Sequence, residues 1–336
     1  MSVSALKTWL QQVCTFSIDS LEEIPGDASF RRYFRLKSDQ QTFIVMDASQ
    51  QRDCFEPFAA ITKALLGLGV TTPKVLALDE EKAYMLISDF GSRICLNELN
   101  SSNADLLYKN ALDVLAVMQA CQEISDWHIP RFDQGFMQRE LDEFKLWFLE
   151  RYLQRTLSYE EQQMLAETCH LLTSAAASQP QVFIHRDYHS ANLMVLDDSQ
   201  IGVLDFQDAC FGPVTYDLVS LLRDCYIDWP DEKVKQWVFY YYEKLQEQRQ
   251  LGNTTFTEFM KWFDWMGMQR HMKALFIFVR KYLRDNTDRY LKHLPRTFNY
   301  LKNQSSRYPE FQAFYCFLES LGEISSVAPL ALAGEG

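Results

Sequence analysis

The first part of the chain alternates between short apolar segments and polar turns, the pattern of a small β-rich lobe. Residues 3–13 have the three- and four-residue hydrophobic spacing of an amphipathic helix, and residues 53–68 repeat that spacing. Elsewhere, runs rich in β-branched and aromatic residues are separated by turn residues, for example at 25–29 and 37–41. The predicted strands cover 21–24, 30–36, 42–46, 75–78 and 84–87.

Beyond residue 90 the hydrophobic period becomes helical. The predicted helices cover 104–121, 137–152, 158–177, 214–225, 231–249, 255–284, 287–303 and 307–321. Ser158 and Glu161 form a capping-box pattern at the start of one of them. A β-rich segment followed by a helical one predicts the α+β class. We expect a nucleotide-binding lobe at 1–90 and a larger, mostly helical lobe at 91–336 with the catalytic loop and the acceptor site.

One segment interrupts the helical region. Residues 181–184 form a short apolar run typical of a buried strand, and 193–196 and 201–204 flank a polar turn at 197–200. These runs predict a strand followed by a β-hairpin. The hairpin is expected to bring Asp205 back beside Asn192, although 13 positions separate them.

The polar residues around this hairpin carry the strongest chemical signal. They read His185-Arg-Asp-Tyr-His-Ser-Ala-Asn192 and, after the hairpin, Leu204-Asp-Phe206. This is the H-R-D-x-x-x-x-N and D-F pattern of kinase-type phosphoryl transfer. A hydroxyl that attacks the γ-phosphate of ATP needs a carboxylate to orient it and accept its proton, which Asp187 supplies. Asn192 and Asp205 offer the hard oxygen ligands that Mg²⁺ prefers.

Composition agrees with an enzyme of two domains. The chain has 336 residues, which is longer than a domain with a single hydrophobic core usually is. Of these residues 47% are hydrophobic and 14% aromatic, enough for a large packed interior. Its net charge of −12 argues against nucleic acid or an anionic membrane as a partner. The same charge is compatible with ATP, because Mg²⁺ and a few local donors neutralise the phosphates.

Targeting and redox signals favour a cytoplasmic protein. No apolar run reaches the length of a membrane span, and the first ten residues lack the basic start and apolar core of a signal peptide. The eight cysteines are scattered without C-x-x-C pairs, which favours reduced thiols. His185 and His189 have a ligand-like spacing, but no H-E-x-x-H motif or cysteine pair completes a zinc site. The oligomeric state is left open.

Residues near the motif are expected to support it. His185 and His189 are predicted to hold the loop by hydrogen bonds. Asp208 is either a second acid near the metal or a turn former. Pro213 fits the start of a helix, and Asp217 in the first turns of that helix is expected to brace the catalytic loop.

The same segment excludes a protein kinase, which carries D-F-G and a long activation segment ending in A-P-E. Here Gln207 replaces the glycine, and a helix is predicted from 214. The forms H-x-D-x-H-x-x-N, L-D-F-Q-D and G-P-x-x-Y-D-L resemble the aminoglycoside phosphotransferase and choline kinase superfamily of small-molecule kinases. Segments 28–35, 45–48 and 185–226 are most similar to the bacterial kinases of N-acetylmuramate and N-acetylglucosamine.

This resemblance implies a protein-kinase-like two-lobe fold and an ATP- and Mg²⁺-dependent reaction. It also implies phosphorylation of the anomeric hydroxyl of an N-acetylated amino sugar, in the recycling of cell-wall peptidoglycan. The residues expected at the nucleotide are Ser29, Arg31 and Arg32 in the small lobe and Ser88 and Asp89 at the hinge.

One departure from the superfamily concerns the third strand, which normally delivers a lysine to the α- and β-phosphates, paired with a helix glutamate. Residues 43–47 contain no lysine, and Glu56 on the following helix has no evident lysine partner. Either Arg31 and Arg32 position the phosphates, or the domain is a weakened kinase. Both arginines could equally be exposed strand charges.

The acceptor site is harder to read from the sequence. A sugar site requires aromatic faces and hydrogen-bonding groups, and a lactyl carboxylate would favour an arginine. The candidates are Arg139, Asp142, Arg223 and Trp229. Two other functions stay open: an aminoglycoside or amino-alcohol phosphotransferase with an acid-rich acceptor pocket, and a nucleotide-binding scaffold without turnover.

Overall fold

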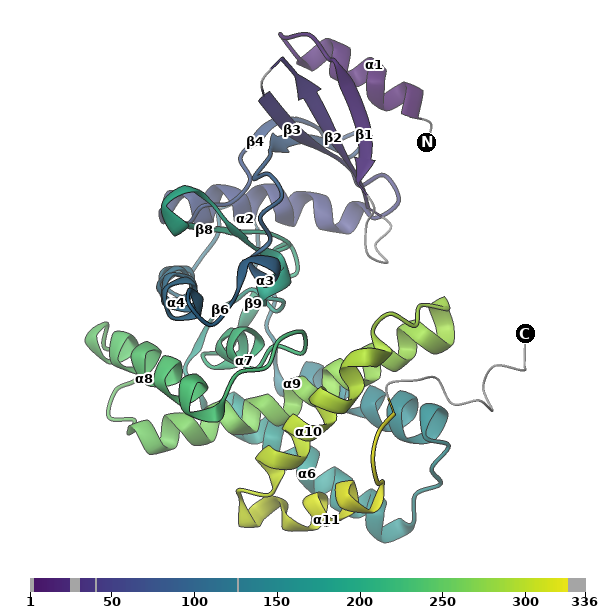
Figure 1. Cartoon of the computed structure of the whole chain (residues 1–336), viewed down its shortest axis with the longest axis vertical. Coiled ribbons are helices and arrows are strands. Elements are labelled where there is room, and N and C mark those ends of the chain that lie inside the picture. The colour runs from purple at the N-terminus through teal and green to yellow at the C-terminus, as the bar shows by residue number, and fades with distance from the viewer. Residues whose placement is uncertain (1–2, 25–30, 40, 126, 326–336) are drawn as a thin grey trace. The chain divides into compact units, whose positions relative to one another are not determined.

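The computed structural model describes residues 3–24, 31–39, 41–125 and 127–325 and divides the chain into two compact units (Figure 1). Unit 1 comprises Met1–Ile129, His185–Asp187 and Ala191–Ala209. Unit 2 comprises Pro130–Ile184, Tyr188–Ser190 and Cys210–Gly336. The functional boundary expected at residue 90 stays a prediction.

Unit 1 is built on a five-stranded antiparallel sheet with the strand order β1-β2-β3-β5-β4. The strands are β1 (Ser20–Ile24), β2 (Arg32–Ser38), β3 (Gln41–Asp47), β4 (Val75–Asp79) and β5 (Tyr84–Ser88). Helix α1 (Val3–Val13) lies against this sheet in Figure 1 and buries Leu6, Trp9 and Leu10 with Phe34 and Tyr84. Because side chains alternate across a strand, the residues that α1 does not cover project from the other face.

Three helices and the catalytic hairpin complete unit 1. They are α2 (Phe55–Gly67), which follows a 3₁₀ turn at Arg52–Cys54, α3 (Cys95–Glu98) and α4 (Ala104–Gln119), with the hairpin strands β7 (Leu193–Val195) and β8 (Ile201–Val203). Hydrogen bonds from Val203 N–H to the Thr71 carbonyl (2.9 Å) and from Val195 N–H to the Arg93 carbonyl (2.9 Å) attach the hairpin to the rest of the unit. Gly202 packs so closely on Phe90 that a Cβ there would lie 2.8 Å from the ring.

Unit 2 is mostly helical. Its elements are α5 (Gln134–Glu143), a π-helix at Phe144–Tyr152, α6 (Tyr159–Ser178), α7 (Tyr216–Leu222), α8 (Asp231–Glu247), α9 (Phe256–Asp285), α10 (Leu294–Ser305), α11 (Gln312–Ser320) and the strand pair β6 (Gln181–Ile184) and β9 (Cys210–Pro213). Helix α9 packs against α6, α7, α10 and the π-helix, and Met268, Met272, Leu275 and Val279 on it are fully buried. Each such side chain stabilises the fold by about 1.5–3 kcal/mol, which makes α9 the centre of this core.

Most of the predicted elements are present. The helix at 3–13, all five strands of the sheet and the catalytic hairpin are confirmed within two residues at each end, and both capping-box hydrogen bonds of Ser158 and Glu161 form. The turn predicted at 25–29 lies outside the described residues.

Four predictions were wrong. The helix predicted from 307 begins only at Gln312, after a 3₁₀ turn at Pro309–Phe311. Pro213 does not begin a helix: it ends β9, a strand that the sequence analysis missed, and α7 begins only at Tyr216. The strand forms because Gln181–Ile184 needs a partner for its backbone, which β9 supplies. The helix predicted from 287 begins at Leu294, after a left-handed Asn286 and a 3₁₀ turn. The helix predicted at 137–152 changes from α to π at Phe144.

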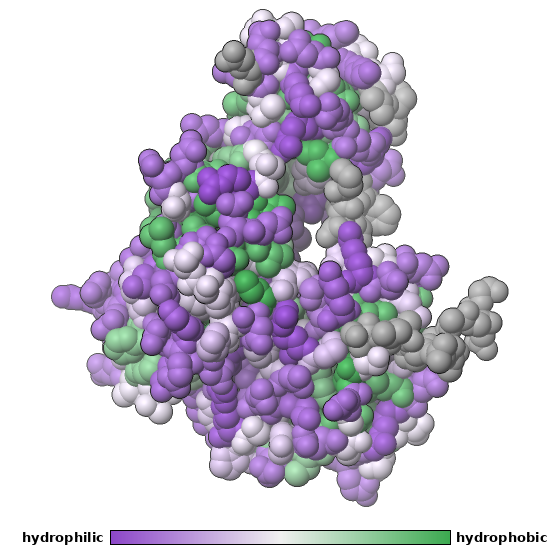
Figure 2. All heavy atoms as spheres, viewed as in Figure 1, coloured by the Kyte–Doolittle hydropathy of each residue, from purple (hydrophilic) through white to green (hydrophobic). Residues whose placement is uncertain are grey.

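The face seen in Figure 2 is largely hydrophilic, with hydrophobic side chains in separate areas. Among the described residues no helix is both long and apolar enough to cross a membrane.

The close contact between α9 and α10 gives a first prediction. A Cβ on Gly267 would lie 2.1 Å from Nε2 of Gln304, a buried side chain that also hydrogen-bonds to His271 (3.0 Å). Gly267→Ala gains about 1 kcal/mol of helix propensity but forces an overpacking cost of about 1–3 kcal/mol. We expect a net loss in the free energy of unfolding, measured by urea denaturation. Gly67→Ala is the matched control, because a Cβ there meets nothing within 4 Å; equal effects of the two substitutions would contradict the packing argument.

Candidate active site

Four hydrogen bonds join the catalytic-loop residues of unit 1 to the end of the hairpin in a closed ring. The Asp187 N–H donates to Nδ1 of His185 (3.2 Å), and Nε2 of His185 lies 2.8 Å from the Leu204 carbonyl oxygen. The Leu204 N–H donates to the Asn192 carbonyl oxygen (3.0 Å), and Nδ2 of Asn192 donates to the Asp187 carbonyl oxygen (3.0 Å). Since a carbonyl oxygen only accepts, Nε2 of His185 carries the proton. The hairpin therefore brings Asp205 beside Asn192, as predicted.

Two residues next to members of this ring have a backbone conformation that L-amino acids rarely adopt. Arg186 has a φ of +76° and Asp205 a φ of +63°. Each costs of order 1–3 kcal/mol and persists only where the surroundings enforce it. Here the enforcing contacts are the hydrogen bonds of His185 and Leu204 on either side.

The Asp205 carboxylate receives two donors on the same oxygen. Nη2 of Arg31 lies 3.1 Å and Nε2 of Gln207 3.0 Å from Oδ1. The Arg31 side chain is nearly buried, and burial alone would lower the pKa of its guanidinium. The neighbouring Tyr33 and Asp205 outweigh burial and raise that pKa, so Arg31 stays charged.

A cavity of about 450 Å³ lies within unit 1 and includes Asn192 and Asp205 in its wall. Its apolar lining comes from the sheet, the residue before α3 and the hairpin segment: Ile24, Ile44, Ile87, Ile94, Met194 and Leu204. Ser88 and Asp89, predicted at the hinge, line it as well. A largely apolar cavity with Asn192 and Asp205 in its wall has the chemistry for a purine base with its phosphates directed toward Asp205.

Arg35 is a residue that the sequence analysis did not single out. Its Nε lies 2.7 Å from Oδ2 of Asp89, and it donates to the Gly91 carbonyl oxygen (2.8 Å), so it ties β2 to the segment after β5. Strand alternation could have identified it. Residues 31, 33 and 35 share one face, and Tyr33 and Arg35 both line the cavity.

The alternation of side chains along an extended strand also places Arg32 on the opposite face from Arg31. Arg32 forms a bidentate ion pair with Glu23 on β1 (both 2.8 Å) at an exposed position, away from the residues that line the cavity. Ser29 lies outside the described residues. On β3, Ile44 faces the cavity and Met46 is buried, while Glu56 on α2 is exposed. Of the arginines predicted at the phosphates, Arg31 is the one the structure brings to Asp205.

The donor set suits Mg²⁺. Nδ2 of Asn192 is used by the Asp187 carbonyl, which leaves the amide oxygen for a cation. Oδ1 of Asp205 accepts two N–H donors, which leaves Oδ2. Two hard oxygen ligands plus phosphate oxygens and water are a usual Mg²⁺ shell.

Three loop residues, Tyr188–Ser190, belong to unit 2, and the last of them is held by a different carboxylate. Asp224 is buried and accepts from both the N–H (3.0 Å) and the hydroxyl of Ser190, and its other oxygen accepts the Tyr226 N–H (2.9 Å). The His189 ring packs edge-on against Tyr226, with centroids 5.4 Å apart. His189 Nδ1 is buried and has no hydrogen-bond partner among the described residues, so this ring contact, not that nitrogen, holds His189.

The candidate acceptor residues all belong to unit 2, and each contacts another side chain. Arg223 is buried, 2.6 Å from Oδ1 of Asp264, so its charge is already neutralised. Trp229 packs edge-on against Trp237 (5.8 Å). Arg139 is exposed with its guanidinium 5.4 Å from the Phe136 ring, and exposed Asp142 accepts from Gln138 (2.9 Å).

The two predicted supporting aspartates differ sharply in exposure. Asp208 is exposed in the turn after Asp205 and accepts from Nε2 of Gln207 (3.2 Å). Asp217 is fully buried in the first turn of α7. Its charge adds to the effect of burial in raising the pKa of Tyr241 far above the ordinary value.

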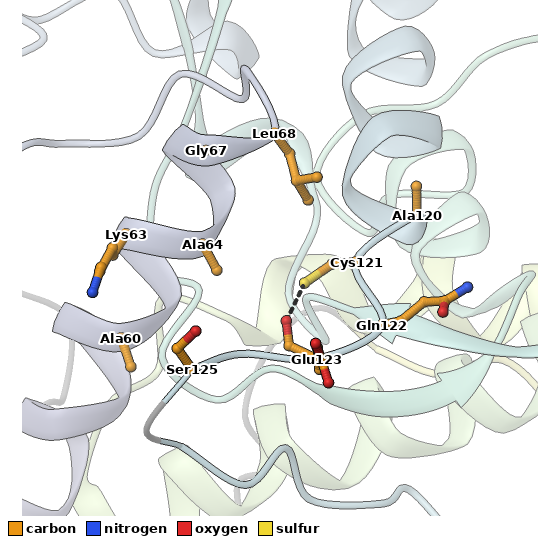
Figure 3. A pocket seen from close by; sticks show the side chains of 10 residues that line it. All are labelled: Ala60, Lys63, Ala64, Gly67, Leu68, Ala120, Cys121, Gln122, Glu123 and Ser125. Carbon is orange, nitrogen blue, oxygen red and sulfur yellow. Dashed lines mark hydrogen bonds between the residues drawn. The ribbon is translucent and has the colours of Figure 1, made fainter.

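A second cavity of about 740 Å³ lies in unit 1 between α2 and residues 120–125 (Figure 3). Leu68 and Cys121 point toward the same space in Figure 3, and the Cys121 thiol donates to the Glu123 carbonyl oxygen (3.6 Å). Its lining includes Lys63 and Glu123 but none of the residues around Asp205. This cavity therefore has no part in the site described above.

Relatives in sequence cover nearly the whole chain. Residues 20–251 match the profile described as the phosphotransferase enzyme family. An N-acetylmuramate/N-acetylglucosamine kinase of Pseudomonas aeruginosa is 39% identical over 310 residues, which cover 92% of this chain and 89% of that protein. A protein of the same name from Neisseria meningitidis serogroup B is 37% identical over 319 residues, covering 94% and 95%.

Solved structures show the fold. A choline kinase from Streptococcus pneumoniae aligns with a TM-score of 0.64 at 12% identity, covering 90% of this chain and 99% of that one. An ADP-bound aminoglycoside phosphotransferase aligns with a TM-score of 0.62 at 14% identity, with the same coverage of both chains. The fold is therefore the protein-kinase-like α+β fold that the sequence predicted.

His271, which contacts the backbone of Arg223 next to Asp224, gives a prediction about how the free energy of unfolding depends on pH. His271 is buried between Oε1 of Gln304 (3.0 Å) and the Arg223 carbonyl oxygen (3.2 Å), and burial lowers its pKa to about 4. The unfolded chain binds the proton near pH 6.5, so the stabilisation from neutral His271 is complete above pH 6.5 and is lost as the pH falls toward 4. Between pH 7 and 5, this one group should cost about 2 kcal/mol in the free energy of unfolding.

Urea denaturation at several pH values measures this loss. His271→Gln should remove that part of the pH dependence, whereas His170→Gln, at an exposed position on α6, should keep the wild-type dependence. A wild-type slope in the His271→Gln protein would show that another group is responsible. His293, whose pKa burial also lowers to about 4, is the first to examine.

Proposed function

The chain belongs to the phosphotransferase enzyme family, and from this premise we propose that it is an ATP- and Mg²⁺-dependent kinase of N-acetylmuramate and N-acetylglucosamine. The product is the sugar 1-phosphate. The proposal also includes its place: the recycling of peptidoglycan sugars in the cytoplasm, where ATP is available.

The closed ring of hydrogen bonds around Asp187, Asn192 and Asp205 is the observation that carries the proposal. It gathers one carboxylate that can accept a proton and two oxygen ligands for a cation at one end of a hairpin. All three groups belong to unit 1, as does the apolar cavity that suits a purine. A scaffold without turnover has no need of such a complete set.

In the proposed reaction the purine of ATP occupies the cavity and its phosphates extend toward Asn192 and Asp205. Bound Mg²⁺ would supply neutralisation of the charge that develops between the β- and γ-phosphates. Arg31 adds a fixed positive charge next to Asp205 and takes the part that a strand lysine has in other kinases. A bidentate guanidinium suits phosphate oxygens at least as well as an ammonium does.

Asp187 orients the acceptor hydroxyl and accepts its proton as the oxygen attacks the γ-phosphate. Its backbone N–H and carbonyl are both held, so the backbone that carries its carboxylate is fixed relative to Asn192 before substrate binds. Such positioning accounts for much of the rate in phosphoryl transfer. The anomeric hydroxyl of a sugar is more acidic than its other hydroxyls, which eases transfer of that proton to a carboxylate.

The choice of acceptor rests on the relatives at 36–39% identity, which share one name across three organisms. Choline kinase and aminoglycoside phosphotransferases share only the fold, at 12–15% identity. The buried acids of unit 2 also argue against a polycationic acceptor, because Asp224 and Asp264 are already used by Ser190 and Arg223.

The acceptor test uses the sugars and their reduced forms. ATP with N-acetylmuramate or N-acetylglucosamine should yield the 1-phosphate, read by phosphorus NMR, with the 6-hydroxyl untouched. The corresponding alditols lack the anomeric centre and should be inert. Phosphorylation of an alditol at a rate near that of its sugar would exclude the anomeric assignment.

The catalytic role of Asp187 is tested separately. Asp187→Asn should reduce turnover by about 10²–10⁴ while ATP affinity stays within a few-fold.

A second test compares neighbouring arginines. Arg31→Ala removes a charge beside the phosphates and should lower kcat/KM for ATP by about 10–100-fold, with a much smaller effect on the acceptor KM. Arg32→Ala breaks only an exposed pair with Glu23 and should leave ATP kinetics within about two-fold. Matching ATP kinetics for the two variants would mean that Arg31 does not meet the phosphates.

A further inference from the structure

Gln207 lies directly beside the carboxylate that we assign to the metal. It follows Phe206, which is fully buried and stacks on Phe58 of α2 with ring centroids 4.9 Å apart. The Ala209 N–H donates to the Phe206 carbonyl oxygen (3.0 Å), so residues 206–209 form a tight turn. An anchored ring on one side and a closed turn on the other fix the backbone of Gln207, and its side chain is only 4% exposed.

The Gln207 amide bridges two carboxylates. Its Nε2 donates to Oδ1 of Asp205 (3.0 Å) and to Oδ2 of Asp208 (3.2 Å). The orientation of the amide follows from chemistry, because its carbonyl oxygen would repel both carboxylates whereas its NH₂ group has one N–H for each. The neutral side chain thus offsets the repulsion between two like charges that a single turn brings together.

We propose that Gln207 is a positioning residue that fixes the Asp205 carboxylate for its cation. This inference rests on the proposed function, in which Asp205 binds Mg²⁺. With Oδ1 occupied by the amide, the carboxylate cannot rotate freely, and Oδ2 would be the oxygen available to a cation. Partners of this kind orient metal ligands and commonly change metal affinity by 10–100-fold when removed.

Arg31 donates to the same oxygen, but the two donors differ in what else they do. Arg31 carries a charge suited to phosphate, so ATP competes with Asp205 for its guanidinium. The Gln207 amide is uncharged, buried and held by its turn, so it stays on Oδ1 whether or not nucleotide is bound. In kinases with glycine at this place no side chain exists to do this.

The inference can be tested by metal binding rather than by turnover. Mn²⁺ binding to the full-length protein saturated with a non-hydrolysable ATP analogue is followed by the electron paramagnetic resonance signal of free Mn²⁺. Gln207→Met keeps the length of the side chain but removes its donors, and it should weaken Mn²⁺ binding by about 10-fold or more. Gln207→Glu adds a third carboxylate to the turn that cannot donate to Asp205, and it should also weaken binding.

Gln269→Met is the matched control. Gln269 is fully buried in unit 2 and its Nε2 donates to Oε2 of Glu140 at 3.0 Å, so the variant loses a buried amide–carboxylate bond of the same length elsewhere. It should bind Mn²⁺ as wild type does, even where its melting temperature falls. A drop in Mn²⁺ affinity equal to that of Gln207→Met would show that the effect reflects general destabilisation, which overturns the positioning role.

The remaining outcomes separate this inference from the function on which it rests. Wild-type Mn²⁺ binding by Gln207→Met, with weakened binding by Asp205→Ala, overturns the role of Gln207 alone. Wild-type binding by Asp205→Ala overturns the metal assignment itself. Tighter Mn²⁺ binding by Gln207→Glu would indicate that residue 207 is a direct ligand, because a carboxylate binds a divalent cation more strongly than an amide does. That result would also overturn the positioning role. Should Gln207→Met fail to fold, Gln207→Glu decides.

Discussion

The site depends on two hydrogen bonds made by the backbone of Leu204. Its N–H binds the Asn192 carbonyl and its carbonyl binds the His185 ring, so one residue closes the ring from both sides. The next residue, Asp205, then has a left-handed φ that no isolated chain would favour. Because the hairpin sets where Leu204 returns, the length of β7 and β8 decides how far Asp205 lies from Asn192 and Asp187.

In each unit, charged side chains are paired with defined neighbours. In unit 1, Arg31 and Gln207 share one oxygen of Asp205, and Arg35 neutralises Asp89. In unit 2, Asp224 accepts from Ser190, and Arg223 pairs with Asp264. A buried charge without a partner costs several kcal/mol, so each of these groups is tied to a defined neighbour. The absence of a lysine from β3 fits this arrangement, because Arg31 already brings a cation to Asp205 from the segment before β2.

Some predictions from the sequence failed for identifiable reasons. A proline such as Pro213 is common at the first position of a helix. Here the backbone of β6 needs a partner strand, and Cys210–Pro213 provides it. Arg223 has the chemistry of a carboxylate receptor but is used by Asp264, which lies 41 positions later on α9. Arg35 and Asp89 are 54 positions apart, and no local pattern connects them. Each case depends on a neighbour that is distant along the chain, which periodicity and spacing do not reveal.

The sequence by itself determined most of the periodic elements and the fold class, and it supplied the residues that we propose as the reacting groups. Hydrophobic spacing depends only on local geometry, and Asp187, Asn192 and Asp205 stand at fixed positions in a motif whose chemistry requires them. Tertiary structure alone decided which of two adjacent arginines meets Asp205, that Gln207 donates to Asp205, and that Asp224 accepts from Ser190. Strand alternation could say that Arg31 and Arg32 face opposite ways. Which face carries the cavity depends on the side of the sheet that α1 covers, and only packing fixes that side.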